Sequence, residues 1–330
     1  MSSSFNARVY GCAVIKAINS NFNADFAHQP RTLPDGRVYA TDKALKHTVR
    51  RYLKNTYPRD GILYFKRIND NMNPLTLADT YTELTKAEGK GFDADSGDKK
   101  LVLQNLLKMQ DVRLFGSTFA AKKGKNTVNL SIHGPVQFTH GLNQFFVDGQ
   151  PRDDIYSEQI SAPFSTDSGD EKEAAQSTLG RQSKLREGHY VYHFSLNPVN
   201  LRDLTSVFEA GTEAAAGLTE QDADRLKEAL RVGVTYLDSA SKAGSENELL
   251  LWVRLKDDSK LVLPSLVEMV RVSRPPGQKA RVELGPVRDL LAHVAADVAT
   301  IELYYLPEQT ELVDAPNNAQ LGHLLTGLAL

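Results

Sequence analysis

The stretch that decides the fold of this chain spans residues 8–55: RVYGCAVIKAI (8–18), NSNFNADFAHQPR (19–31) and, after a loop, TDKALKHTVRRYLKN (41–55). The first segment is a run of small and β-branched apolar residues that ends in asparagine, a pattern typical of a buried strand. The last segment begins with Thr41, a favourable N-cap, and places apolar residues at helical intervals. We therefore predict a core strand, a polar turn and an amphipathic helix in succession.

Positive charge is concentrated around this helix. From His28 to Arg67 the sequence has ten Lys or Arg residues and three acids, although the formal net charge of the whole chain is −2. The balancing acids come later, around residues 153–173 and 209–228. Because the charge is segregated along the chain, we expect a local basic surface that binds a polyanion.

Composition limits the remaining possibilities. The chain has 330 residues, of which 41% are hydrophobic, and is long enough to bury a sizeable core. Its single cysteine, Cys12, excludes an internal disulfide and a cysteine metal site, and suits a reducing cytoplasm. No apolar run is long enough to span a membrane, so we expect a soluble, cytoplasmic protein. Phosphate-loop, nucleophile-elbow and dinucleotide motifs are missing, so no cofactor is expected.

Further strands and helices alternate along the chain. Thr219 and Asp222 stand at capping-box spacing at the start of the clearest helix, LTEQDADRLKEALRVGVTYLDSA. Polar, irregular stretches at 70–110 and 143–187 have the composition of insertions. We predict one α+β domain over residues 1–330, with a ferredoxin-like core and these two insertions. The segments expected to be strands are GILYFKRI (61–68), TVNLSIHGPVQF (127–138), HYVYHFSLNP (189–198) and ELLLWVRLK (248–256).

Acidic residues near the basic helix offer a catalytic alternative. Asp25, Asp35 and Asp42 could hold a divalent metal for phosphodiester cleavage. Asp35 suits a turn and Asp42 a first helical turn, whereas Asp25 has no evident structural role. His189 and His193 are four residues apart in a predicted strand, about 13 Å, and so cannot share a metal ion.

Six segments follow one another in a characteristic order: NSNFNADFAHQPR, GRVYATDKALKHTVRRYL, DVRLFG (111–116), HGPVQF (133–138), TLGRQSKLREGHYVYHFSLNP (178–198) and the helix 219–238. In this order they resemble the backbone subunit of CRISPR Cascade complexes (the Cas seven family), closest to its subtype I-B branch. The family's turn usually reads Asn-Pro-Asn-Gly-Asp, and here Phe22 and Ala24 replace its Pro and Gly.

The resemblance implies an RRM-like palm, with the two insertions as finger (70–110) and thumb (143–187). It implies a non-catalytic subunit without metal or cofactor that polymerises along CRISPR RNA in a type I complex. The subunit would hold this guide for pairing with target DNA. Its partners would be CRISPR RNA, the target DNA strand, further copies of itself in a helical filament and other Cascade subunits. Type III relatives use an aspartate in the same loop to cut RNA, so a metal-dependent ribonuclease using Asp25 stays the alternative.

The same resemblance implies a set of RNA contacts. A guide must be held whatever its sequence, which suits contacts from amides and cations to phosphate and sugar. The expected backbone contacts are Asn19, Asn21, Asn23, Arg31, Thr41, Lys43, Lys46 and Arg50, with Gly134 and Gln137 beside the RNA and Arg181, Lys184 and Arg186 contributed by the thumb.

Overall fold

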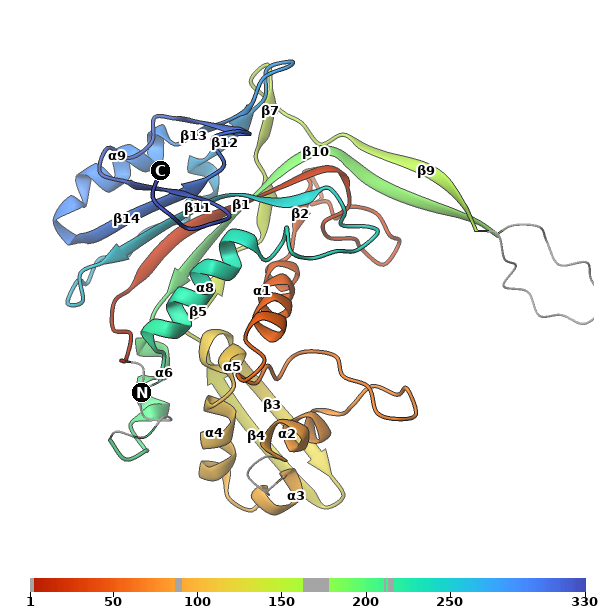
Figure 1. Ribbon diagram of the computed structural model, residues 1–330, viewed down its shortest axis with the longest axis vertical. Coiled ribbons are helices and arrows are strands. Elements are labelled where there is room, and N and C mark those ends of the chain that lie inside the picture. Colours follow the sequence, from red (N-terminus) through yellow and green to blue (C-terminus); the bar gives the residue numbers. More distant parts are fainter. Residues whose placement is uncertain (1–2, 87–90, 163–177, 211, 213–216) are drawn as a thin grey trace, which may run out of the picture.

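A computed structural model describes residues 3–86, 91–162, 178–210, 212 and 217–330 (Figure 1). The described strands form a nine-stranded, a five-stranded and a two-stranded sheet, and helices pack against them. This mixed α/β arrangement is consistent with the predicted α+β class. No described helix is both long and apolar enough to cross a membrane.

The predicted first strand is confirmed and forms the centre of the large sheet. β1 pairs antiparallel with β10 on one side and with β11 on the other. The sheet order is β16-β14-β11-β1-β10-β6-β2, and β5 and β9 also pair with β10. The bounds are β1 (Val9–Ser20), β2 (Tyr39–Ala40), β5 (Val136–Phe138), β6 (Gly141–Asn143), β9 (Ile155–Ala162), β10 (Thr178–Leu196), β11 (Ser245–Leu255), β14 (Val298–Tyr305) and β16 (Gln320–His323).

Two helices, α1 (Asp42–Thr56) and α8 (Glu220–Val232), cover one face of this sheet (Figure 1). Both were predicted, and the capping box of α8 is formed by the side chains and backbone of Thr219 and Asp222. Since successive strand residues point to opposite faces, alternate residues of β1 enter this core. The side chains buried there include Ala13, Ile15, Leu45, Val49, Leu53, Leu226, Leu230 and Trp252.

The opposite face of the sheet is covered by the C-terminal part of the chain together with residues 145–151. The other residues of β1, such as Cys12 and Val14, pack there against Val272, Val282 and Leu291. β1 is therefore buried on both faces. The covering elements are β7 (Phe145–Val147), β8 (Gln150–Pro151), η2 (Val267–Met269), β12 (Arg271–Ser273), β13 (Ala280–Glu283), α9 (Gly285–His293), η3 (Ala295–Asp297) and β15 (Thr310–Val313).

A separate lobe has a hydrophobic core of its own, made by buried residues between Leu63 and Ile132 together with Leu201. The rings of Tyr81, Phe92 and Phe119 meet at its centre. The segment 70–110 lies within this lobe. Its elements are α2 (Leu77–Thr85), α3 (Phe92–Asp95), α4 (Lys99–Leu107), α5 (Gln110–Phe115), β3 (Gly116–Lys123), β4 (Asn126–His133) and α6 (Val199–Thr205).

The strand predicted at 61–68 is wrong. This segment forms only an isolated bridge, between Ile68 and Pro74. The backbone N–H groups of Leu63 and Tyr64 instead donate to the carboxylate of Asp111, at 2.7 and 3.0 Å. A buried carboxylate is a strong acceptor, so it satisfies donors that a sheet ladder would otherwise take.

β9 and the first part of β10 form a ribbon that projects from the body (Figure 1). Its register runs from Leu185 opposite Ile155 to Thr178 opposite Ala162. Residues 155 and 157–160 are exposed, so the strand shows no alternation of buried and exposed residues. This part of the stretch 143–187 therefore has no readable period. Part of it, residues 163–177, lies outside the described residues.

Candidate nucleic-acid interface

The asparagine turn after β1 is held mainly by its own side chains. Asn21 is buried, and its amide donates to the carbonyl oxygens of His28 and Ser183, both at 3.2 Å. The amide oxygen of Asn23 accepts from the backbone N–H and the hydroxyl of Thr41, at 2.9 and 3.0 Å. Asn21 therefore links the turn to β10, and Asn23 links it to the N-cap of α1.

Asn19 occupies a different position from the other two asparagines. It is exposed and adopts a φ of 49°, a left-handed conformation that asparagine tolerates better than most residues. Its amide oxygen accepts a hydrogen bond from the hydroxyl of Tyr156 on β9, at 3.2 Å. Of the three amides, only that of Asn19 lies at the surface, where it meets the ribbon.

The basic face of α1 is less available than its sequence indicates. Lys46 is paired with Asp42 one turn earlier, at 3.2 Å. Arg50 donates through Nε to the fully buried Asp111, at 3.1 Å, and its guanidinium lies 5.0 Å from the ring centre of Phe115. Lys43 is exposed and has no ion pair or hydrogen bond to a described residue. The first turn of α1 thus carries the most available cation of this face.

His47 adds no positive charge to α1 at neutral pH. Burial, and then the positive charges of Lys242, Arg51 and Arg50, lower the pKa of its imidazole below the ordinary value of 6.5. The ring also stacks on Phe65, with centres 5.8 Å apart and planes 8° apart. His47 therefore stacks on Phe65 of the neighbouring loop, with its side chain still exposed on one side.

Gly134 and Gln137 lie where the lobe joins the sheet. Gly134 is buried, and a Cβ atom there would come within 2.0 Å of the backbone of Phe115, so the close approach of the two chain segments requires glycine. The exposed Gln137 donates through its amide to the carbonyl oxygen of Gly134, at 2.9 Å. The ammonium group of Lys46 lies 6.0 Å from the ring centre of Phe138, which places this strand beside α1.

Three predicted cations lie on the ribbon. Arg181 and Arg186 are exposed, and neither side chain has an ion pair within the described residues. Lys184 is paired with Glu158 across the ribbon at 2.6 Å, and this hydrogen bond raises the pKa of its ammonium group. Arg186 borders an open cavity of ≈ 460 Å³ with Arg152, Asp153, Asp154 and Tyr156.

These contacts join the turn, the start of α1 and the base of the ribbon into one surface, here called the turn–ribbon surface. Asn21 connects the turn to β10, and Asn23 connects it to Thr41. Arg31 follows the turn, is half-buried, and donates its backbone N–H to the carbonyl oxygen of Asn23, at 3.3 Å. The surface presents amides and cations, the groups that contact phosphate and sugar without reading base sequence.

Comparison with known proteins supplies the family. The family model described as CRISPR-associated protein Cas7 matches residues 7–284. The chain belongs to the Cas7 family. The predicted family is therefore confirmed. No curated protein matches this chain.

The solved structures similar to this Cas7 chain include two subunits of surveillance complexes. A chain of a "CRISPR RNA-guided surveillance complex, pre-nicking" has 13% sequence identity and a TM-score of 0.55, with 96% of each chain covered. A chain of a "CRISPR RNA-guided surveillance complex" has 14% identity and a TM-score of 0.48, covering 94% of this chain and 96% of the other. At 13% identity, the similarity to the first of these structures is a similarity of fold alone.

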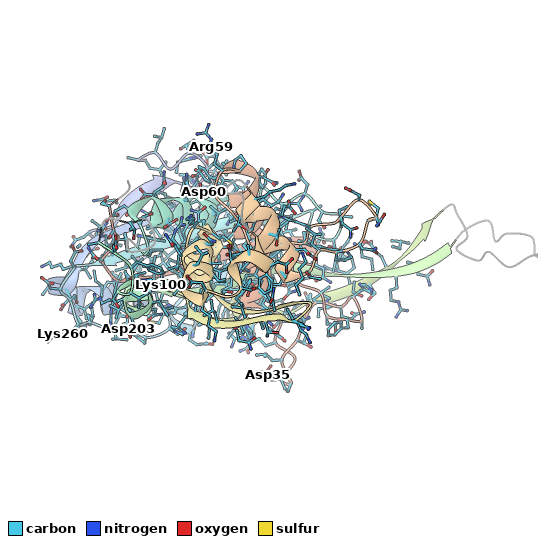
Figure 2. The ribbon with its side chains drawn as sticks, turned by 90° about the horizontal axis from the view of Figure 1, so that it is seen from below. Asp35, Arg59, Asp60, Lys100, Asp203 and Lys260 are labelled. Carbon is cyan, nitrogen blue, oxygen red and sulfur yellow. The ribbon has the colours of Figure 1, made fainter. Side chains whose placement is uncertain are left out.

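The three candidate carboxylates of this Cas7 chain all have structural roles. Asp25 accepts from the backbone N–H groups of Ala27 and Gln29, both at 2.8 Å, so the expectation that it has none is wrong. Asp35 accepts from the N–H of Arg37 at 3.1 Å and points away from the body (Figure 2). Asp42 pairs with Lys46. Among the described residues, no three His, Cys, Asp or Glu side chains are placed to hold a metal ion.

Two residues of the turn–ribbon surface were missed by sequence reasoning. Tyr156 and Ser183 contact the asparagine turn across 137 and 162 residues of chain, respectively. Both come from the stretch without a readable period. The pairing of β10 with β1 brings Ser183 to the turn, and the pairing of β9 with β10 brings Tyr156 there, so no local signal could have identified them.

Proposed function

We propose that this Cas7 chain is a non-catalytic structural subunit of a CRISPR RNA-guided surveillance complex, in which it coats CRISPR RNA. The observation that carries the proposal is the turn–ribbon surface, which joins amides and cations of three distant segments within the part of the chain that the family model matches. The solved structure that this fold resembles is itself part of an RNA-guided complex.

The arrangement of the central sheet supports an RRM-like palm. The strands β11-β1-β10-β6 lie in the order that a ferredoxin-like core requires, and α1 and α8 both pack on one face. In this proposal the lobe that contains 70–110 is the finger, and the ribbon within 143–187 belongs to the thumb. The separate core of the lobe supports its assignment as an insertion into the palm.

We assign different roles to the thirteen predicted contacts. Lys43, Arg181 and Arg186 are exposed cations that would contact phosphates directly, and Asn19 and Gln137 are exposed amides that would contact sugar or phosphate. The remaining residues have intramolecular contacts that hold the surface in shape or, like Arg31, lie half-buried at its edge. They are Asn21, Asn23, Arg31, Thr41, Lys46, Arg50, Gly134 and Lys184.

The proposal includes partners other than the guide. Copies of this chain would associate head to tail along the RNA, since a heterologous interface that does not close produces a filament. The RNA so held would pair with the target DNA strand, and other Cascade subunits would bind at the ends of the filament. We assign the complex to subtype I-B and to the cytoplasm, in line with the sequence resemblance and with the buried, unpaired Cys12.

The test is assembly of the full chain on single-stranded RNAs of increasing length. We expect the number of copies per RNA to rise in steps with RNA length and the affinity to fall with salt. A single copy bound at every length would contradict the proposal. Magnesium-dependent cleavage of the RNA that Asp25→Ala abolishes would establish the ribonuclease alternative instead.

A further inference from the structure

A fully exposed aromatic ring lies beside the turn–ribbon surface. Phe26 is 99% exposed, in the loop that follows the asparagine turn. Between residues 3 and 60, all of which the structure describes, no other large hydrophobic side chain is exposed. An apolar ring gains free energy when it leaves water, so a ring held entirely in solvent is unusual in a well-ordered loop.

The loop that carries Phe26 has a twin in the same molecule. In residues 24–30 and 68–74, the side-chain oxygen of Asp25 or Asn69 accepts from the N–H groups two and four residues later, at 2.8 Å in the first loop and 3.0 Å in the second. The backbone hydrogen bonds and the flanking bridge to a proline also correspond. In both loops, one residue has a φ of 61°: His28 and Met72.

The twin shows that the loop does not need the ring of Phe26. The residue at the equivalent position of the second loop is Asp70, which is exposed and charged. The same backbone therefore forms with an apolar or an acidic side chain at this position. Neither the core nor the local hydrogen bonding accounts for a phenylalanine here, so the ring is available to a partner outside the chain.

The surroundings of Phe26 favour a nucleobase as that partner. The amide of Asn21 donates to the carbonyl oxygens of both His28 and Ser183, which fixes the loop to β10 at the base of the ribbon. In Figure 1 this loop projects on the side toward which β9 and β10 extend. Docking of a protein needs a contiguous apolar patch, whereas a single ring among polar residues suits stacking on one base.

We propose that Phe26 is a stacking platform for a base of the RNA that this chain binds. The inference rests on the proposed function. It adds base stacking to the electrostatic contacts of that function. Every base has a π-face, so stacking on a phenyl ring tolerates any guide sequence. The Asx turn of Asp25 fixes the backbone that carries Phe26 before binding, which limits the backbone entropy lost when the base stacks.

The test uses the full chain and single-stranded RNAs that carry 2-aminopurine at successive positions, a base whose fluorescence changes on stacking. We expect Phe26→Ala to abolish the fluorescence change at the stacked position and to weaken binding about five- to tenfold. The salt dependence should stay the same because no charge is removed. Phe26→Trp should retain the signal, and Asp70→Ala, at the equivalent position of the twin loop, is the matched control.

The outcomes separate this inference from the proposed function. If the wild-type chain binds RNA and Phe26→Ala gives the same fluorescence and affinity as Asp70→Ala, the stacking proposal is wrong. It is also wrong if Phe26→Ala keeps the fluorescence change but reduces the number of copies per RNA, because the ring then contacts another copy. Failure of the wild-type chain to bind RNA at low salt would overturn the proposed function and this inference together.

Discussion

The basic face of α1 and the ribbon of β9 and β10 carry similar charge in the sequence but differ in what the fold does with it. On α1, Lys46 and Arg50 are paired with Asp42 and with the buried Asp111. On the ribbon, Arg181 and Arg186 have exposed side chains without an ion pair among the described residues. The number of basic residues in a segment therefore does not indicate how much positive charge is accessible to a ligand. We expect substitutions on the two regions to have different effects.

The largest effect on stability is expected at Arg50. Arg50→Ala removes the ionic partner of the fully buried Asp111, and breaking a buried pair is strongly destabilising. Asp111 keeps the N–H donors of Leu63 and Tyr64, so we expect a loss of about 2 kcal/mol rather than the full penalty.

Thermal and denaturant unfolding measure this loss, with the exposed Lys43→Ala as control. The control should change the free energy of unfolding by less than about 0.5 kcal/mol. Equal stability of the two variants would mean that Arg50 is as available to a ligand as Lys43, and the contrast between α1 and the ribbon would disappear.

On the ribbon we expect substitutions to affect RNA binding and not stability. The double variant Arg181→Glu with Arg186→Glu should weaken RNA binding by about tenfold or more and reduce the salt slope by about 0.7 for each phosphate that is no longer neutralised. Its melting temperature should remain that of the wild type because both side chains are exposed. Binding titrations at several salt concentrations give both the affinity and the salt slope.

Lys260→Glu is the control for that double variant. Lys260 is also exposed, but it lies at the end of the molecule remote from the ribbon (Figure 2). If Lys260→Glu weakens binding as much as a charge reversal on the ribbon does, binding follows the net charge of the chain and not the turn–ribbon surface.

A smaller effect is expected from the two lysines at the start of α1. Lys43→Gln should weaken RNA binding about threefold, whereas Lys46→Gln should change it less because Lys46 is already paired with Asp42. Glutamine removes the charge and keeps most of the side-chain length. The same titrations measure both variants, and a larger effect of Lys46→Gln would reverse our assignment of these residues.

The smallest effect concerns pH and the root of the ribbon, where β10 enters the large sheet. The buried His189 contacts Glu248 at 2.5 Å and Glu187 at 3.1 Å, and Arg274 contacts Glu187 at 2.8 Å. Burial lowers the pKa of His189, but the two carboxylates outweigh it, and the pKa is raised above 6.5. Burial raises the pKa of Glu187, but His189 and Arg274 outweigh it, and the pKa is lowered below 4.5.

These shifts set the pH range in which the cluster stabilises the fold. The contribution of His189 is complete below 6.5 and is lost as the pH rises through its raised pKa. The contribution of Glu187 is complete above 4.5 and is lost as the pH falls through its lowered pKa. The melting temperature should decrease as the pH rises through the pKa of His189 and as the pH falls through the pKa of Glu187. The decrease on the alkaline side should be weaker in His189→Gln. An unchanged alkaline fall in that variant would exclude His189 as its cause.

Local patterns explain why part of this fold is predictable. β1, α1 and α8 are encoded by neighbouring residues, through an apolar run, helical spacing and the Thr219–Asp222 capping box. The pairing of Arg50 with Asp111 joins residues 61 positions apart, and the same carboxylate accepts the backbone N–H groups of Leu63 and Tyr64 in the segment predicted to be a strand. Within residues 259–330, β12 and β13 pack on the second face of β1, whereas β14 and β16 extend the large sheet, so all of these strands depend on contacts distant in the sequence.

The candidate site was likewise predictable from the sequence only in part. The sequence resemblance selects residues of the asparagine turn, of α1, of the segment 134–137 and of the ribbon, but it does not distinguish those that are exposed from those that shape the turn. Asn21 and Asn23 belong to the same asparagine turn as Asn19, yet their amides are used inside the protein. That distinction depends on contacts with Ser183 and Thr41, which no local pattern reports.

The most direct test of the central claim is the nucleic-acid content and mass of the protein purified from its native operon context. The account predicts one RNA of defined length that carries several copies of this chain together with other subunits. RNA-free monomers or dimers from the same context would contradict the account, and the candidate carboxylates would then be tested for cleavage.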